Sequence, residues 1–171
     1  MLHVVLCQPE IPQNTGNVMR TCAGTGAKLH LIGPLGFRVD EKSLKRFGAN
    51  CLDGVEFDVS PDYAAFVSTH PGIYAFFTRY GTRSPDRFDF GRPDADYYLV
   101  FGRESTGLPK ELLRAHRDAC LRFPMKDAIR SLNLANAVCA GLYEALRQQG
   151  YPGLSRTEPE TLKGADWLDR D

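Results

Sequence analysis

Three polar stretches of the chain combine glycine with side chains that can bind or orient a ligand. Their sequences are NTGNVMR (residues 14–20), FGRESTGLP (101–109) and RSLNLA (130–135). Glycine lets a ligand approach the backbone closely, and arginine suits the recognition of phosphate or carboxylate. Three such loops exceed what stability alone requires. We therefore expect one binding site that is assembled from three distant parts of the chain.

The first stretch could gather several polar groups at the start of a helix. Along such a helix, Arg20 lies about one and a half turns beyond Asn14, and Gly16 leaves room for a ligand. The amide, the glycine and the guanidinium could then converge on a phosphate or carboxylate.

Each stretch taken alone also fits a purely structural interpretation. Asn14 with Thr15, and Ser131 with Asn133, are residue types that accept hydrogen bonds from the first amides of a helix. Glu104 could cap the helix that follows it. Each loop alone therefore favours a helix cap, and only the three together favour a shared site.

Several common active-site signatures are missing from the sequence. No Gly-Lys-Ser/Thr follows Gly102, as a phosphate-binding P-loop requires, and Gly24-Thr25-Gly26 lacks the third glycine of a dinucleotide-binding turn. There is no Gly-x-Ser-x-Gly hydrolase motif. The histidines at positions 3, 30, 70 and 116 show no metal-ligand spacing, so we expect no metal site.

Length and composition favour one compact domain. The 171 residues, 43% of them hydrophobic, suffice for a sizeable core, and the sequence turns polar after Gly153. We expect a domain over residues 1–153 and a mobile or loosely docked tail over 154–171. Lys and Arg number 21, as do Asp and Glu, so the formal net charge is zero and any contact with RNA requires local basic patches.

The cysteine pattern and the hydropathy bear on the cellular compartment. Five cysteines are irregularly spaced, and their odd number argues against a disulfide framework. No apolar run approaches the ~20 residues that span a bilayer, and the apolar run at residues 1–7 is too short for a secretory signal. We expect a soluble cytoplasmic protein with no membrane association.

Apolar runs alternate with helical periodicity along the chain. Strands are predicted at residues 2–7, 28–32, 55–59, 73–78, 97–101 and 120–123. Helices are predicted from about residue 14 to the glycines at 24–26, and at 41–47, 61–67, 110–116 and 133–149. This alternation predicts an α/β fold with a mostly parallel sheet and helices on both faces. Ligands of such sheets bind beyond the carboxyl ends of the strands.

The final predicted helix has a broad apolar face. Ala140 and Tyr143 widen this face beyond what one helix on a small sheet usually requires. On this evidence, ordinary core packing and a subunit interface are equally consistent with the pattern. The apolar residues that recur at steps of three and four are Ala135, Val138, Leu142 and Leu146.

Four motifs, taken in order and spacing, resemble those of the SPOUT superfamily of RNA methyltransferases, and in particular its small 2′-O-ribose methyltransferases. The motifs are IPQNTGN, FGRESTGLP, RSLNLANAV and LYEALRQQGYPG, and the resemblance covers about residues 1–153. It implies a deep trefoil knot, S-adenosylmethionine as cofactor and an obligate homodimer with the last helix at the interface. The implied reaction is methylation of the ribose 2′-hydroxyl of the tRNA wobble nucleotide, a cytidine or uridine at position 34. The alternatives are methylation of another tRNA or rRNA nucleotide, and a non-catalytic RNA-binding or ribosome-assembly protein.

The resemblance also assigns residues to the site. It implies catalytic roles for Arg20, Asn14, Glu104, Ser131 and Asn133. Because a guanidinium stays protonated, we expect Arg20 to hold a phosphate or to stabilise the developing alkoxide, with Asn14 and Glu104 orienting it. The residues implied to contact the cofactor are Phe77, Thr78, Gly102, Phe123, Ser131, Leu132 and Leu134.

Two basic patches are expected to bind the anticodon stem-loop of tRNA. Each could also be ordinary solvated surface, but in a dimer both could flank one cleft, which predicts salt-dependent RNA binding. Tyr80, beside the second patch, could stack on a base. The patches consist of Lys42, Lys45 and Arg46, and of Arg79, Arg83 and Arg87.

Overall fold

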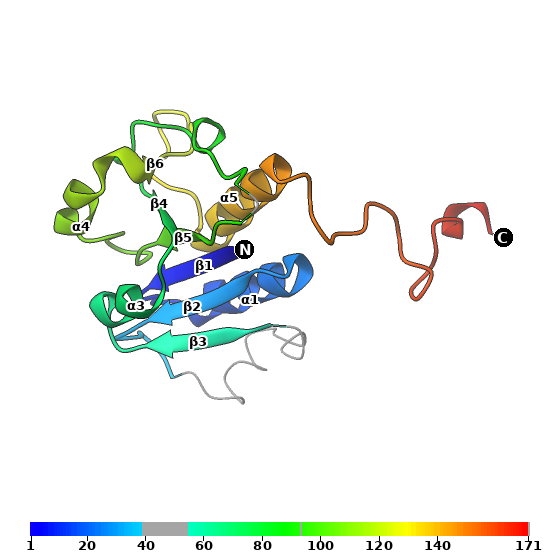
Figure 1. The fold of residues 1–171 in the computed structure, drawn as a ribbon, viewed down its shortest axis with the longest axis horizontal. Coiled ribbons are helices and arrows are strands. Elements are labelled where there is room, and N and C mark those ends of the chain that lie inside the picture. The colour runs from blue at the N-terminus through cyan, green and yellow to red at the C-terminus, as the bar shows by residue number, and fades with distance from the viewer. Residues whose placement is uncertain (39–54, 93, 171) are drawn as a thin grey trace.

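Six parallel strands form one sheet at the centre of the protein (Figure 1). The computed structural model describes residues 1–38, 55–92 and 94–170. Within these residues the strand order is β3-β2-β1-β5-β4-β6, and every neighbouring pair is parallel. The predicted parallel sheet is therefore confirmed. The strands are β1 (Leu2–Cys7), β2 (Lys28–Ile32), β3 (Phe57–Ser60), β4 (Ile73–Phe77), β5 (Tyr97–Phe101) and β6 (Cys120–Leu121).

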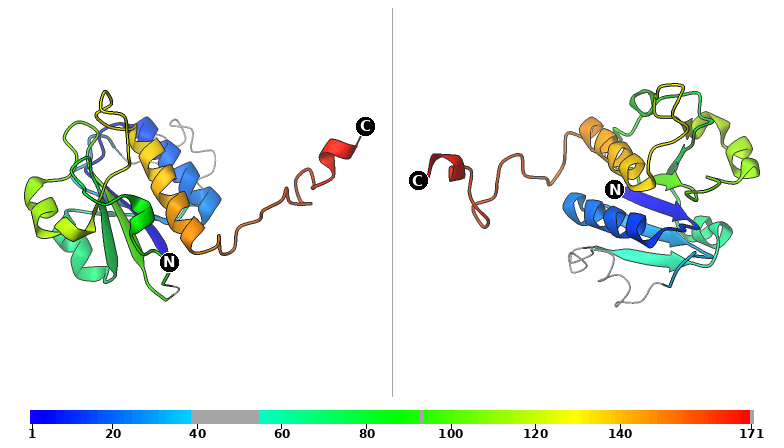
Figure 2. Two further views of the ribbon diagram at one scale, coloured as in Figure 1. Left: turned by 90° about the horizontal axis from the view of Figure 1, so that it is seen from above. Right: turned by 180° about the vertical axis from the view of Figure 1, so that it is seen from behind.

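Helices cover both faces of the sheet, as predicted (Figure 2). They are α1 (Pro12–Thr25), α3 (Tyr63–Thr69), α4 (Lys110–Ala115) and α5 (Leu134–Gln148). α1 and α5 pack side by side on one face, and α3 and α4 lie on the other. Alternate residues of β1 point to the two cores, with Val4 and Leu6 toward α1 and α5, and Val5 and Cys7 toward the opposite core.

The middle of the sheet is apolar at nearly every position because helices cover it on both sides. Every residue of β1 and of β5 is buried. The edge strand β3, in contrast, exposes all its residues except the last, which is half-buried. Continuous apolar runs were thus the correct signal for the central strands.

The order of the strands changes direction between β1 and β5. From β1 the sheet continues through β2 and β3 on one side, and through β5, β4 and β6 on the other. The loops after β1 and β5 therefore leave neighbouring strand ends in an arrangement where α/β folds form a ligand crevice.

Helix α1 begins earlier than predicted. Its first residue is Pro12, with Ile11 at the N-cap, whereas the prediction took the prolines as a break and started the helix near Asn14. Proline fits the first turn because the N–H that it lacks would have no partner there. Asn14 consequently lies inside the first turn and is not a cap.

Other bounds shift only slightly. The strand predicted at 120–123 ends at Leu121, and the one predicted at 55–59 runs from Phe57 to Ser60. The helix predicted at 41–47 lies outside the described residues. In the part of the chain that the structure describes, no helix combines the length and the apolar character needed to cross a membrane.

The C-terminal segment extends away from the body of the protein (Figure 1). It contains one 3-10 turn at Trp167–Asp169, and the Lys163 ammonium lies 4.5 Å from the centroid of the Trp167 ring. Leu162 and Leu168 are exposed. The mobility of this tail stays a prediction.

The loop after β4 and the segment after β6 lie against each other. The amide of Arg122 donates to the carbonyl of Arg83 at 2.9 Å, and the amide of Thr78 donates to that of Leu121 at 2.9 Å. A Cβ on Gly81 would lie 2.6 Å from the carbonyl carbon of Leu121, so only glycine permits this approach. Such backbone contacts are compatible with the knot implied by the resemblance, which stays a prediction.

Candidate active site

A cavity of about 670 Å³ opens beyond the carboxyl ends of β4, β5 and β6. The end of each of these strands contributes to its wall, and so do the loop at 102–108 and the segment at 123–134 that leads into α5. The volume lies within the range of small-molecule sites. The cavity is therefore placed where a parallel sheet is expected to bind a ligand.

The cavity brings together the residues that the resemblance assigned to the cofactor. Asn14, Glu104, Ser131 and Asn133, four of the five catalytic candidates, also line it. Their contact with a ligand stays a prediction. The implied cofactor contacts that line the cavity are Phe77, Thr78, Gly102, Phe123, Ser131, Leu132 and Leu134.

Aromatic rings form an apolar wall of the cavity. The Phe77 ring stacks on Phe101 with 4.5 Å between centroids, and on Phe123 with 5.4 Å. Behind them, Gly141 of α5 lies so close that a Cβ there would be 2.9 Å from Cζ of Phe77. This glycine lets α5 approach the sheet and fixes the position of the wall.

Gly102 marks a sharp reversal of the chain after β5. The amide of Gly107 donates to the carbonyl of Arg103 at 2.9 Å, and Gly107 has a left-handed backbone with φ of 74°. A Cβ on Gly102 would lie 2.2 Å from the carbonyl carbon of Gly107. A side chain at position 102 is therefore excluded by the folded-back loop.

A hydrogen-bond network joins the three polar stretches at the cavity wall. Nδ2 of Asn133 donates to Oδ1 of Asn14 at 3.0 Å, and Nδ2 of Asn14 donates to Glu104 at 2.9 Å. Oδ1 of Asn133 also accepts from the amides of Ala135 and Asn136, at 2.9 and 3.3 Å. Asn133 is thus both the N-cap of α5 and a member of the site.

Glu104 binds the two residues that precede α1 and does not cap the helix that follows it. Its carboxylate accepts from the amides of Glu10 and Ile11, at 2.9 and 3.2 Å, in addition to Asn14. In return, the Glu10 carboxylate accepts from the hydroxyl and the amide of Ser105, at 2.9 and 3.0 Å, and these bonds hold the pKa of Glu10 below its usual value. The loops after β1 and β5 therefore hold each other reciprocally through two carboxylates.

Arg20 lies outside this cavity, in a shallow groove between α1 and α5. The groove is also lined by Asn17, Asn136 and Tyr143. Six residues along a helix rotate a side chain by about 240° around the axis, so Arg20 points away from Asn14. Within one chain, the structure therefore does not bring Arg20 to Asn14 and Glu104, as the expected orienting role requires.

Arginines surround the mouth of the cavity, including two that the sequence analysis did not select. Arg79 and Tyr80 line the mouth, and the Arg79 guanidinium lies 5.0 Å from the centroid of the Tyr80 ring, which is 68% exposed and so accessible for stacking. Arg103 and Arg130 also line the cavity, and Nε of Arg103 donates to Gln8 at 2.8 Å. Their positions inside the polar stretches were a signal that could have identified them.

The remaining members of the predicted basic patches do not line the cavity or lie outside the described residues. Arg83 and Arg87 are exposed, and Arg87 lies 3.3 Å from the Asp86 carboxylate. The patch at 42–46 lies outside the described residues.

Comparisons with known proteins identify a family and several relatives that this chain resembles. A family model described as the SpoU rRNA Methylase family matches residues 1–143. A Bacillus subtilis protein named "Putative tRNA (cytidine(34)-2'-O)-methyltransferase" is 51% identical over 158 residues, covering 90% of this chain and 96% of the relative. A Geobacillus stearothermophilus protein of the same name is 48% identical over 156 residues, covering 90% of this chain and 99% of the relative.

Solved structures of methyltransferases also resemble this chain. A Bacillus anthracis structure described as a "putative RNA methyltransferase" superposes with a TM-score of 0.88 at 48% identity, covering 91% of this chain and 98% of the other. A structure described as giving "insights into the 2-OH methylation of C/U34 on tRNA" has a TM-score of 0.79 at 45% identity, covering 88% and 97%. The methyltransferase AviRb of Streptomyces viridochromogenes, solved with the cofactor AdoMet, has a TM-score of 0.71 at 28% identity, covering 87% and 58%. With the family model matched over most of its length, this chain belongs to the SpoU rRNA methylase family.

Proposed function

We propose that this chain transfers the methyl group of S-adenosylmethionine to the ribose 2′-hydroxyl of nucleotide 34, a cytidine or uridine, of tRNA. The observation that carries the proposal is the convergence of the three polar stretches on one cavity at the carboxyl ends of the strands. Relatives at 48–51% identity that bear the name of this reaction support the choice of substrate. A tRNA substrate and the free thiols of the described cysteines favour the cytoplasm.

The lining of the cavity fits S-adenosylmethionine. The stacked rings of Phe77 and Phe123 provide an apolar surface for the adenine, and the segment around Gly102 offers backbone groups at the wall. Ser131 and Asn133 add hydroxyl and amide groups for the polar parts of the ligand. When bound there, the cofactor supplies a methyl group activated by a positively charged sulfur.

The residues of this chain would act mainly by positioning. Correct placement of two reactants can lower the activation free energy of a reaction by ~7 to 11 kcal/mol. The bonds among Asn14, Glu104 and Asn133 fix the starts of α1 and α5 and the loop after β5 relative to one another. The ribose hydroxyl is a very weak acid, so a cation beside its oxygen would stabilise the negative charge that develops as its proton leaves.

We further propose that Arg20 of a second copy supplies this cation. Arg20 is exposed and lies in the α1/α5 groove, away from the cavity of its own chain. The same surface exposes Tyr143 by 46%, which is unusual for a large ring on a helix that otherwise packs on the core. A homodimer formed through α1 and α5 would cover this surface.

The RNA would approach over the arginines at the mouth of the cavity. Arg79 and Arg130 can contact phosphates, and the exposed ring of Tyr80 can stack on an unpaired base of the anticodon loop. This local patch permits binding by a chain whose net charge is zero.

The decisive experiment uses anticodon stem-loop RNAs and radiolabelled cofactor. An RNA with cytidine or uridine at position 34 should be methylated, an RNA with a 2′-deoxynucleotide only at position 34 should not, and a 2′-deoxynucleotide at position 35 should leave methylation intact. Methylation that persists on the 34-deoxy RNA would mean that another nucleotide is the substrate. Tight RNA binding without methylation would favour the non-catalytic alternative.

A further inference from the structure

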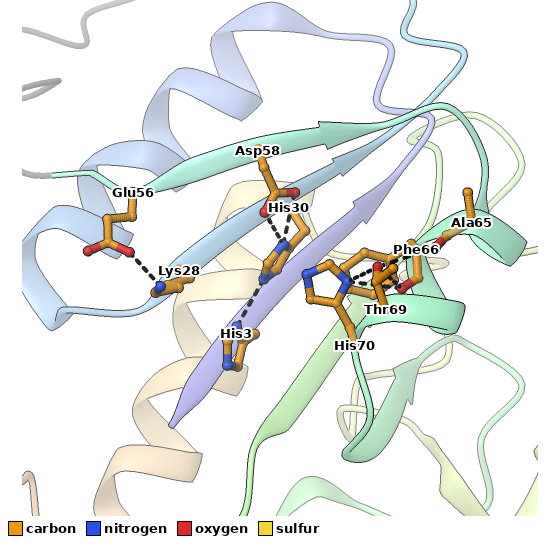
Figure 3. A network of polar contacts seen from close by, with 9 residues as sticks. All are labelled: His3, Lys28, His30, Glu56, Asp58, Ala65, Phe66, Thr69 and His70. Atoms are coloured by element: carbon orange, nitrogen blue, oxygen red, sulfur yellow. Dashed lines mark hydrogen bonds and ion pairs between the residues drawn. The ribbon is translucent and has the colours of Figure 1, made fainter.

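Three histidines and one aspartate gather on the face of the sheet that carries α3 (Figure 3), and none of them lines the cavity. His30 of β2 and Asp58 of β3 are direct neighbours in the strand register. His3 lies on β1, and its Nδ1 is 2.9 Å from Nε2 of His30. His70, at the end of α3, lies beside His30 with 4.9 Å between ring centroids.

His30, Asp58 and His70 bring three potential metal ligands close together. One ligand atom from each lies within 4.8 Å of those of the other two. His30 is buried, which holds one ligand in place, and Asp58 keeps half of its side chain exposed, which lets an ion enter from solvent. Two imidazoles and one carboxylate are a common ligand set for zinc, with a water in the fourth position.

The hydrogen bonds of His70 leave one ring nitrogen available. Nδ1 of His70 lies 2.9 Å from the carbonyl oxygen of Phe66, which can only accept, and 2.9 Å from the Thr69 hydroxyl, which can accept or donate, so a proton on Nδ1 satisfies both contacts. Nε2 then has a free lone pair, and in Figure 3 this nitrogen points toward His30. Metal-binding histidines typically donate their other N–H to a backbone carbonyl in this way.

The pairing of His3 with His30 presents a conflict. If His30 donates from Nδ1 to Asp58, at 2.9 Å, its Nε2 must accept from Nδ1 of His3. Nε2 of His3 is then a bare acceptor, buried without a hydrogen-bond partner and 3.6 Å from an oxygen of Asp96, another acceptor. Two acceptors facing each other are unfavourable.

A cation bound at Nδ1 of His30 removes this conflict. Nε2 of His30 then carries the proton and donates to Nδ1 of His3, and Nε2 of His3 becomes an N–H directed at Asp96. The same cation would be held by Asp58 and His70, whose ligand atoms lie within 4.8 Å of that of His30.

We propose that His30 Nδ1, the Asp58 carboxylate and His70 Nε2 bind one Zn²⁺, with His3 as the residue that orients His30. Tetrahedral zinc places its ligand atoms about 3.3 Å apart, so the 2.9 Å between Nδ1 and the carboxylate has to open slightly, and separations of up to 4.8 Å among the three ligand atoms have to close. The exposed Asp58 can make this movement. The ion would tie the edge strand β3 and the end of α3 to β2, a structural role independent of methyl transfer.

The test uses the full chain purified without a histidine tag and stripped with a chelator. After zinc is added back and the excess is dialysed away, the wild type should hold one equivalent of zinc per chain by elemental analysis. Co²⁺ added in place of zinc should give the visible absorption of a nitrogen- and oxygen-ligated ion. His70→Gln and Asp58→Asn should lose this binding. His3→Gln should keep the ligands but weaken zinc affinity by about 10- to 100-fold, as loss of an orienting partner does.

His116→Gln is the matched control, because His116 is exposed and stacks on Phe76 away from this cluster. It should bind zinc as the wild type does. The proposal is overturned if the wild type retains no zinc, if both ligand variants retain it fully, or if the cobalt spectrum shows thiolate ligation. Circular dichroism of each variant separates loss of binding from loss of folding.

Discussion

Replacement of Glu104 by glutamine should destabilise the fold measurably, because this carboxylate holds the start of α1. One oxygen accepts from Ile11 and Asn14, and the other accepts from Glu10. A glutamine can keep one of these oxygens, but its NH2 group would then face a donor, whichever way the amide is turned.

The expected loss follows from these contacts. A hydrogen bond to a charged group contributes about 1.5–3 kcal/mol, and a negative charge at a helix N-terminus contributes about 0.3–1 kcal/mol. Because the site is only partly buried, we expect Glu104→Gln to lower the free energy of unfolding by about 1.5–3 kcal/mol. Glu158→Gln, in the exposed tail, removes a negative charge of the same kind and should change the free energy of unfolding by less than about 0.5 kcal/mol.

Urea denaturation followed by far-ultraviolet circular dichroism is the suitable assay. The only tryptophan, Trp167, is exposed in the tail and would not report on the domain. The slope of the free energy against urea should be unchanged, so that the midpoint carries the effect. If Glu104→Gln unfolds at the same urea concentration as Glu158→Gln, the carboxylate does not hold α1 and the reasoning is wrong.

Three further predictions concern the cavity and its surroundings. The inactive variants Arg20→Ala and Ser131→Trp, the second of which blocks the cavity, should recover about a quarter of wild-type methyl transfer when their subunits are mixed into dimers. Random pairing leaves one site in four with both an open cavity and an Arg20 from the partner. No recovery would place Arg20 in its own chain's site. Arg79→Ala should reduce the slope of log affinity for RNA against log salt by about 0.7–1 in binding titrations, and an unchanged slope would mean that Arg79 contacts no phosphate. Gly141→Ala gains about 1 kcal/mol of helix propensity, but its methyl group would push Phe77 into the cavity at a cost of about 1–3 kcal/mol. Calorimetry should therefore show weaker cofactor binding, and wild-type affinity with higher stability would contradict this.

Local sequence patterns were sufficient to place the central strands, but they placed the ends of several other elements less accurately. β1, β2 and β5 have the predicted bounds because their apolar runs are buried on both faces and end at turn residues. The start of α1 was misplaced because Pro12 can either break a helix or begin one. β6 is shorter than its apolar run, since the chain turns at Arg122 to bond with the loop after β4.

The site was only partly accessible to sequence reasoning. The three stretches could be recognised by residue type, but the two bonds that Ser105 donates to the Glu10 carboxylate join residues 95 positions apart, and no local pattern encodes them. The histidine cluster shows the same limit. His3 and His30 are far apart in the chain, and only the parallel register brings them together. Spacing rules for metal ligands therefore gave no signal.

Helix α5 connects the cavity with the surface that carries Arg20. Its first turn is capped by Asn133, which also bonds Asn14 at the start of α1, and the side of the same two helices forms the groove that contains Arg20. A second copy that packs on this groove would contact the two helices whose first residues form part of the cavity wall. In the proposed dimer, one contact surface would therefore both deliver Arg20 and hold the Asn14–Glu104–Asn133 network in place.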